Sequence, residues 1–163
     1  HGIEKALLNL GGNVGIIGIP AGRESWGVAV RDPRHADALL GTLSLGADFD
    51  GWGVASSGQY ERYFEYEGKR YGHIIDPRTG FPVEGVLGTT VVASTAMQAD
   101  ALSTSLFVVG EEQGISLLMA EPVAFGMIML PDGEDGLRIR ISKELASHFT
   151  LFEGAEGVSI EAF

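Results

Sequence analysis

Apolar residues along this chain occur in short runs separated by glycine, asparagine and aspartate. Such runs between turn residues are typical of β-strands, and the 24 glycines suit the tight turns that would join them. Gly11-Gly12-Asn13 and Glu67-Gly68-Lys69 both have the composition of hairpin turns. The pattern predicts strands at residues 6–10, 14–19, 26–30, 41–47, 54–57, 60–66, 70–75, 86–93, 123–130 and 137–141.

The pattern changes to a helical one after residue 94. Thr95 and Gln98 have the spacing of a capping box, in which each side chain hydrogen-bonds the other residue's backbone amide. We therefore expect a helix over 96–109 that ends at Gly110, followed by a second helix over 111–120. No repeat, low-complexity tract or proline-rich linker interrupts the chain. The prediction is one α+β unit with mixed, mostly antiparallel short strands and a few helices.

The composition of the chain excludes several classes of function. The chain has 163 residues and 45% apolar composition, enough for one domain with a core. Its 11 basic and 22 acidic residues give a formal net charge of −11, which argues against a nucleic-acid surface. A phosphorylated ligand would need a metal ion or a local arginine to offset this charge. The absence of cysteine excludes disulfides and thiolate chemistry, and no apolar run is long enough to span a membrane.

The first predicted helix carries a group of oxygen-bearing side chains. Asp100 and Thr104 lie one helical turn apart, with Ser103 beside them. Since Phe107 and Val108 lie towards the same side, we expect this face to be largely buried and its polar groups to have partners. Oxygen ligands one turn apart suit Mg²⁺. On these residues alone the alternative is favoured, in which the hydroxyls bond the carbonyl four residues earlier and Asp100 favours the helix dipole.

The segment HIIDPRTG, residues 73–80, gathers several reactive groups in one bend. It offers a base (His73), a carboxylate (Asp76), a cation (Arg78), a hydroxyl (Thr79) and a free backbone amide near Gly80. A site that handles phosphate needs this combination. Each residue also has an ordinary explanation, because a lone histidine on a strand is more often a hydrogen-bonded core residue and Asp-Pro is common turn chemistry.

Four motifs in order complete the pattern: NLGG (9–12), SGQYERYF (57–64), HIIDPRTG (73–80) and ADALSTSLFVVG (99–110). Together they resemble the ApbE family, the FAD:protein FMN transferases, over essentially the whole chain. The family usually has aspartate where Asn13 stands, and aspartate is common where Gln59 stands. The resemblance implies a T-fold-related α+β domain. It also implies that residues 1–163 are its C-terminal portion, completed by an upstream half of the same protein.

The resemblance further implies a Mg²⁺-dependent reaction in which FAD is split at its pyrophosphate. FMN passes to a Thr or Ser hydroxyl of an acceptor flavoprotein, and AMP leaves. His73 is then the base, Mg²⁺ is held by Asp100 and Thr104 with Ser103, and Ile74 contacts FAD. By their chemistry and proximity, Arg78, Thr79 and Gly80 are candidates to hold phosphate. Asp76 is also a candidate residue of the FAD-binding segment, where it would orient either His73 or the turn.

Two alternatives stay open at this point. The first is a Mg²⁺-dependent FAD pyrophosphatase, in which water replaces the acceptor hydroxyl. The second is a flavin-binding protein without turnover, which the presence of His73, Asp100 and Thr104 disfavours. By analogy with the family, we expect the protein to act in the periplasm or cell envelope.

Overall fold

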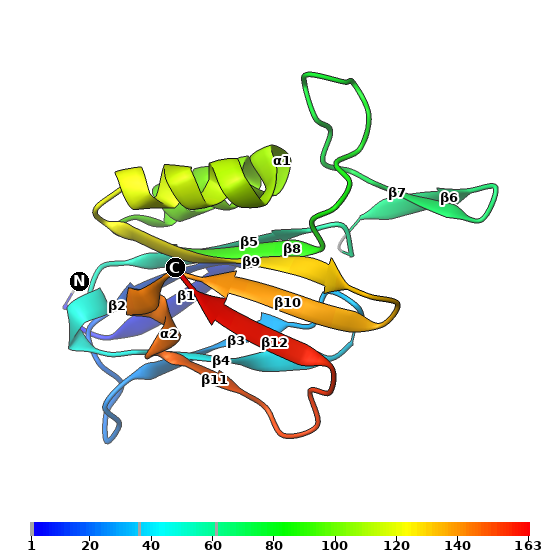
Figure 1. Ribbon diagram of the computed structural model, residues 1–163. Helices are drawn as coiled ribbons and strands as arrows, with labels where there is room; N and C mark the ends of the chain where they lie inside the picture. The colour runs from blue at the N-terminus through cyan, green and yellow to red at the C-terminus, as the bar shows by residue number, and fades with distance from the viewer. Residues whose placement is uncertain (1, 36, 61) are drawn as a thin grey trace.

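The computed structural model describes residues 2–35, 37–60 and 62–163. Figure 1 shows three layers, with a helical layer above a large sheet and a smaller sheet below it. The large sheet has seven strands, which pair antiparallel with their neighbours except for the last two, which are parallel. In spatial order they are β1 (Ala6–Leu10), β2 (Asn13–Ile17), β5 (Gly53–Gly58), β8 (Gly88–Ala93), β9 (Ala124–Asp132), β10 (Gly136–Ile141) and β12 (Val158–Ala162).

The smaller sheet closes the core from below. Its strands are β11 (Phe149–Leu151), β4 (Leu39–Leu45) and β3 (Trp26–Arg31), and two short helices, η1 (Ala47–Phe49) and α2 (Lys143–Ala146), flank it. The apolar faces of the two sheets form the main core, to which Ile16, Leu43, Val92, Met129 and Ile139 contribute. β8 is central in the large sheet and all its residues are buried, because the helical layer covers its other face.

The helical layer is α1 (Ala96–Ala120), which doubles back on itself at Gly110. Gly110 has φ 82° and ψ −169°, a backbone conformation that only glycine adopts readily. The two helical segments then run side by side, as the 3.4 Å contact from Gln98 Nε2 to Glu121 Oε2 shows at their open end. α1 packs on β5, β8 and β9 through small and aliphatic side chains such as Ala99 and Leu106. This packing fixes where the polar side chains of its first segment lie.

A two-stranded ribbon, β6 (Tyr63–Tyr66) and β7 (Lys69–Gly72), extends away from the sandwich. Residues 73–87 then form a long loop that returns to the sheet at β8. The described part of the chain contains no helix with the length and apolarity needed to cross a membrane.

Most predicted elements are confirmed, with boundaries that shift by a few residues. The break at Gly110 and the cap on Gln98 N by Thr95 Oγ1 (3.1 Å) are as expected. The other hydrogen bond of the predicted capping box, from the Thr95 amide to the Gln98 side chain, is wrong, because that side chain accepts from Ser94 Oγ instead. The strand expected over 60–66 begins only at Tyr63, and its residue 61 lies outside the described residues. Four elements were not predicted: η1, α2, β11 and β12.

Candidate functional site

The oxygen-bearing side chains of α1 meet two strands of the large sheet. Ser103 Oγ donates to the Asp100 carbonyl (3.0 Å), and Ser57 Oγ of β5 lies 3.0 Å from Ser103 Oγ and 3.2 Å from Thr104 Oγ1. Thr89 Oγ1 of β8 donates to the Ser103 carbonyl at 2.8 Å. The sheet therefore holds this turn of the helix through hydroxyl groups. Ser57 was missed from the sequence, although it lies in one of the quoted motifs.

The direction of these hydrogen bonds follows from the single proton on each hydroxyl. Ser103 gives its proton to the Asp100 carbonyl, so Ser57 must donate to Ser103. Thr104 then donates to Ser57, because Ser57 has no second proton to give. This order leaves the lone pairs of Thr104 Oγ1 outside the chain of hydrogen bonds, where they can accept or coordinate.

Burial on this face differs from the expectation. Ser103 and Phe107 are fully buried, but the side chains of Asp100 and Thr104 are exposed. The expectation of a largely buried face is therefore wrong for these two residues, because α1 packs on the sheet through Ala99, Ser103 and Leu106 instead. The predicted back-bond also occurs in a modified form, since Ser103 bonds the carbonyl three residues earlier rather than four.

The donor set fits a magnesium ion. Mg²⁺ binds through one or two carboxylates and keeps several waters or substrate oxygens in its shell. Asp100 and Thr104 supply one carboxylate and one oriented hydroxyl at an exposed position. The described residues contain no group of three or more His, Cys, Asp or Glu that could hold a metal by themselves. Ser103 is less accessible, since its buried hydroxyl already contacts Asp100 O and Ser57 Oγ, and its role as a ligand remains a prediction.

His73 lies at the base of the ribbon, with its side chain exposed. Its backbone amide donates to the Arg62 carbonyl at 3.1 Å, and its ring Nδ1 lies 3.1 Å from the same oxygen. Because a carbonyl can only accept, this contact requires the proton on Nδ1, which leaves Nε2 of the neutral ring as a proton acceptor. The interpretation of His73 as a buried core histidine is therefore wrong.

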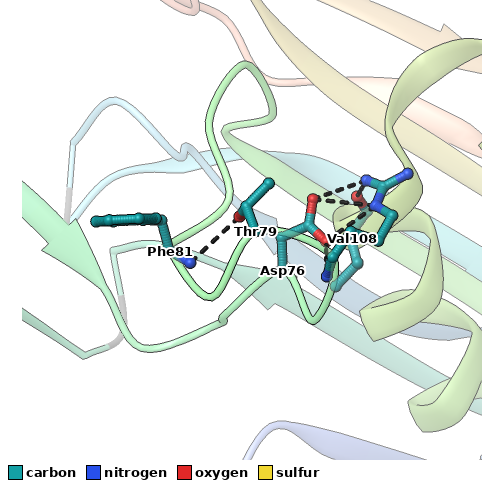
Figure 2. Close-up of polar contacts among 5 residues, drawn as sticks. Asp76, Thr79, Phe81 and Val108 are labelled. Carbon is teal, nitrogen blue, oxygen red and sulfur yellow. Dashed lines mark hydrogen bonds and ion pairs between the residues drawn. The ribbon is translucent and has the colours of Figure 1, made fainter.

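The bend after His73 is closed by hydrogen bonds within itself. Asp76 N donates to Phe81 O at 2.8 Å, while Thr79 N and Gly80 N donate to Asp76 O at 3.2 and 2.8 Å. Thr79 Oγ1 accepts from Phe81 N at 3.2 Å (Figure 2). Gly80 has φ 75°, a conformation that favours glycine. The amide of Gly80 is thus already bonded, so the expectation of a free amide at this residue is wrong.

The Asp76 carboxylate and the Arg78 guanidinium form a bidentate ion pair. Arg78 Nε and Nη2 donate to Asp76 Oδ1 and Oδ2 at 2.9 and 2.8 Å, and Arg78 N donates to Oδ1 at 2.8 Å. These hydrogen bonds hold the pKa of Asp76 below its usual value and raise the pKa of Arg78. Asp76 therefore orients the turn, the second of the two roles considered for it. The contacts of Arg78, Thr79 and Gly80 with FAD phosphate remain predictions.

The bend also reaches the helix and the core. Arg78 Nη2 donates to the carbonyl of Val108 on α1 at 3.0 Å (Figure 2). Ile74 is half-buried against the cluster that contains Val86 and Phe107, and its carbonyl accepts from Val83 N at 3.0 Å. The contact of Ile74 with FAD stays a prediction. The structure thus connects the His73 segment to the helix that carries Asp100 and Thr104.

An open groove of about 770 Å³ lies between the bend and the end of the first helical segment. Arg78, Val86 and Gly110 line it, together with Gln59 and Tyr71 at the ribbon side. Gln59 Nε2 donates to the Val83 carbonyl, so Gln59 supports the loop wall. The sequence alone did not indicate this role.

These features define a class of protein: a mixed α+β sandwich in which a histidine-bearing loop is bonded to a helical hairpin through Arg78 and the Val108 carbonyl. The model of the ApbE family matches residues 1–128, and the chain belongs to the ApbE family.

Comparison with individual proteins agrees with this assignment. A Klebsiella pneumoniae protein named FAD:protein FMN transferase is 42% identical over 118 residues, which are 71% of this chain and 34% of that protein. A Treponema pallidum protein of the same name is 38% identical over 141 residues, 81% of this chain and 38% of that protein. The chain thus spans little more than a third of the length of these curated relatives.

Solved structures show the same fold. The ApbE protein from Thermotoga maritima superposes with a TM-score of 0.74 at 36% identity, covering 88% of this chain and 44% of that chain. The flavin transferase ApbE from Vibrio cholerae gives a TM-score of 0.70 at 29% identity, covering 90% of this chain and 45% of that one. The predicted α+β fold and the family resemblance are both confirmed.

Proposed function

We propose that the full-length protein is a Mg²⁺-dependent FAD:protein FMN transferase that modifies a Thr or Ser hydroxyl of an acceptor protein. The relatives carry this name, and the chain supplies a base and a carboxylate–hydroxyl pair on connected elements. The observation that carries the proposal is His73, whose exposed ring is fixed by Arg62 O with Nε2 as the proton acceptor. The roles of the other candidate residues follow from their chemistry and from the family resemblance.

In the proposed reaction, His73 Nε2 takes the proton from the acceptor hydroxyl. The hydroxyl oxygen forms a bond to the FMN phosphorus of FAD, the pyrophosphate bond to the AMP oxygen breaks, and AMP leaves with that oxygen. Phosphoryl transfer of this kind depends mainly on positioning and on neutralising charge. A positioned general base contributes about 10²- to 10⁴-fold to the rate.

Asp100 and Thr104 are the residues that would hold Mg²⁺. The ion, when bound, would offset the charge of the pyrophosphate, which a chain of net charge −11 would otherwise repel. Ser57 orients Thr104, and the buried Ser103 links Ser57 to the helix backbone.

Hydrolysis of FAD to FMN and AMP is the second candidate. An accessible His73 Nε2 can take a proton from water in the same way as from an acceptor hydroxyl. The two activities share every residue named above and differ only in the nucleophile. The two activities can therefore be distinguished by their products but not by their site residues.

The test is AMP release from FAD and Mg²⁺ by the full-length protein, with and without an acceptor protein that contains the target threonine. The intact mass of the acceptor is read in the same reaction. AMP with a flavin adduct supports the transferase, and AMP without an adduct supports the pyrophosphatase. Bound FAD without AMP would instead indicate a non-catalytic flavin-binding protein.

Two variants with matched controls assign the residues. His73→Ala should abolish transfer and leave FAD affinity nearly intact, while His35→Ala, which removes another exposed histidine, should change neither. Asp100→Asn should weaken Mg²⁺ and FAD binding together, while Glu112→Gln on the second helical segment should not. Transfer by His73→Ala at the normal rate would exclude the histidine as the base.

A further inference from the structure

Arg78 joins two parts of the site that are far apart in the sequence. Its Nη2 donates both to the Asp76 carboxylate at 2.8 Å and to the Val108 carbonyl at 3.0 Å. Figure 2 labels Asp76 and Val108. Val108 lies two residues before Gly110, where the helix breaks. The last four carbonyls of a helical segment have no amide partner within it, and a cation near them is favoured by the helix dipole. Arg78 therefore caps the first segment of α1.

The contact is transmitted to His73 because the bend between them is closed. Asp76 N to Phe81 O and Val83 N to Ile74 O are backbone hydrogen bonds of 2.8 and 3.0 Å, which make residues 74–83 a compact unit. Ile74, the residue next to His73, belongs to this unit. Holding the unit against α1 therefore also holds the backbone of His73 on one side. On the other side the His73 amide is held by its hydrogen bond to the Arg62 carbonyl.

We infer that Arg78, oriented by Asp76, is a positioning residue that fixes the His73 segment against the helix carrying Asp100 and Thr104. This inference deepens the proposed function and rests on it. It goes beyond the expectation that Arg78 binds phosphate, because Nε and Nη2 are both engaged within the protein. A lysine at this position would keep the charge but cannot make the bidentate contact and reach the carbonyl together.

The chain contains a matched control for this arrangement. Residues 32–34 repeat the sequence Asp-Pro-Arg, and Asp32 accepts from Arg34 N, Nε and Nη2 at 2.9, 3.0 and 2.7 Å. Arg34 Nη1 likewise donates to remote carbonyls, those of Asp135 and Glu156, both at 3.0 Å. This second turn thus fastens the β9–β10 turn and the loop before β12, and it does not bond the His73 segment.

The experiment compares Arg78→Lys with Arg34→Lys in the full-length protein. The measurements are kcat for AMP release at saturating FAD and Mg²⁺, Kd for FAD by flavin fluorescence, and amide hydrogen exchange of residues 73–83. Since a displacement of about 1 Å at a reacting centre can cost about 100-fold, we expect Arg78→Lys to lower kcat by about 10- to 100-fold. Its Kd should stay within about twofold, and exchange over 73–83 should accelerate. Arg34→Lys should leave kcat and this exchange unchanged.

Other outcomes would overturn the inference. A large rise in Kd with unchanged kcat would make Arg78 a phosphate contact, and an equal loss of kcat in both variants would indicate general destabilisation. Unchanged exchange over 73–83 in Arg78→Lys would mean that the contact with Val108 holds nothing in place. If the unmodified protein releases no AMP, the proposed function fails, and faster exchange in Arg78→Lys alone would still support the mechanical link.

Discussion

Replacing Gly110 with alanine tests whether one backbone conformation sets the geometry of the helical hairpin. Gly110 has φ 82° and ψ −169°, and an added Cβ would meet no atom within 4 Å apart from its chain neighbours and the adjacent backbone of its own helix. The cost is therefore backbone strain and not a clash. Residues held in such sparsely populated regions cost about 1–3 kcal/mol. Alanine also restricts the unfolded chain, which returns about 0.4–1 kcal/mol where it is tolerated. We expect a net destabilisation of about 1–2 kcal/mol, or about 5- to 30-fold in the folding equilibrium.

The assay is urea unfolding of the full-length protein, with Gly15→Ala as the control. Gly15 in β2 has an ordinary φ and open space around its Cβ position, so alanine there should change the free energy of unfolding by less than about 0.5 kcal/mol. Gly110→Ala should also lower activity, because the break at Gly110 exposes the Val108 carbonyl to Arg78. A change below about 0.5 kcal/mol for Gly110→Ala would refute the argument from strain.

Three further predictions concern the site and its supports. Ser57→Ala should weaken Mg²⁺ affinity by about 10-fold, because the mutation frees the Thr104 hydroxyl to rotate. A Mg²⁺ titration of FAD binding measures this affinity, and an unchanged value would contradict the role of Ser57. Glu111→Gln should lower the free energy of unfolding in urea by about 1 kcal/mol, since Glu111 accepts from both Arg138 Nη atoms at 2.9 Å in a partly exposed pair. An unchanged free energy would mean that solvent screens the ion pair fully. Hydrogen bonds from arginines lower the pKa of Glu111 and of Asp76. The stability that these two carboxylates contribute is present above the usual carboxyl pKa and is lost as the pH falls through the lowered values. Unfolding free energies measured from pH 7 to about pH 3 should show this loss.

The hairpin strands and the helical break were accessible from sequence because their signals are local. Turn residues lie between the strands that they join, and Gly110 marks its own break. The missed strands depend on distant partners. β11 pairs with β4, where Phe149 faces Leu43, and β12 runs parallel to β10. Three- to five-residue segments with mixed polarity carry no periodic signal strong enough to show such pairing.

The candidate residues were identified from their types and motifs, but several of their roles were not. The family resemblance implied a base at His73 and oxygen ligands at Asp100, Ser103 and Thr104. Arg78 was a candidate phosphate contact by its chemistry and proximity. The structure adds the hydroxyl of Ser57, which is 47 residues from Thr104, and shows Arg78 bonded to a carbonyl 30 residues away. Contacts over such separations leave no spacing that could be recognised in the chain.

The sequence by itself determined the residue chemistry, the α+β class, the family and the position of the helical break, because these depend on local pattern and on motif order. The tertiary structure alone decided that Asp100 and Thr104 are exposed, that Ser57 orients Thr104, and that Arg78 caps α1. Burial and hydrogen-bond partners depend on how the sheet, the helix and the loop pack together. Packing brings distant residues within bonding distance, and that juxtaposition is a property of the folded chain.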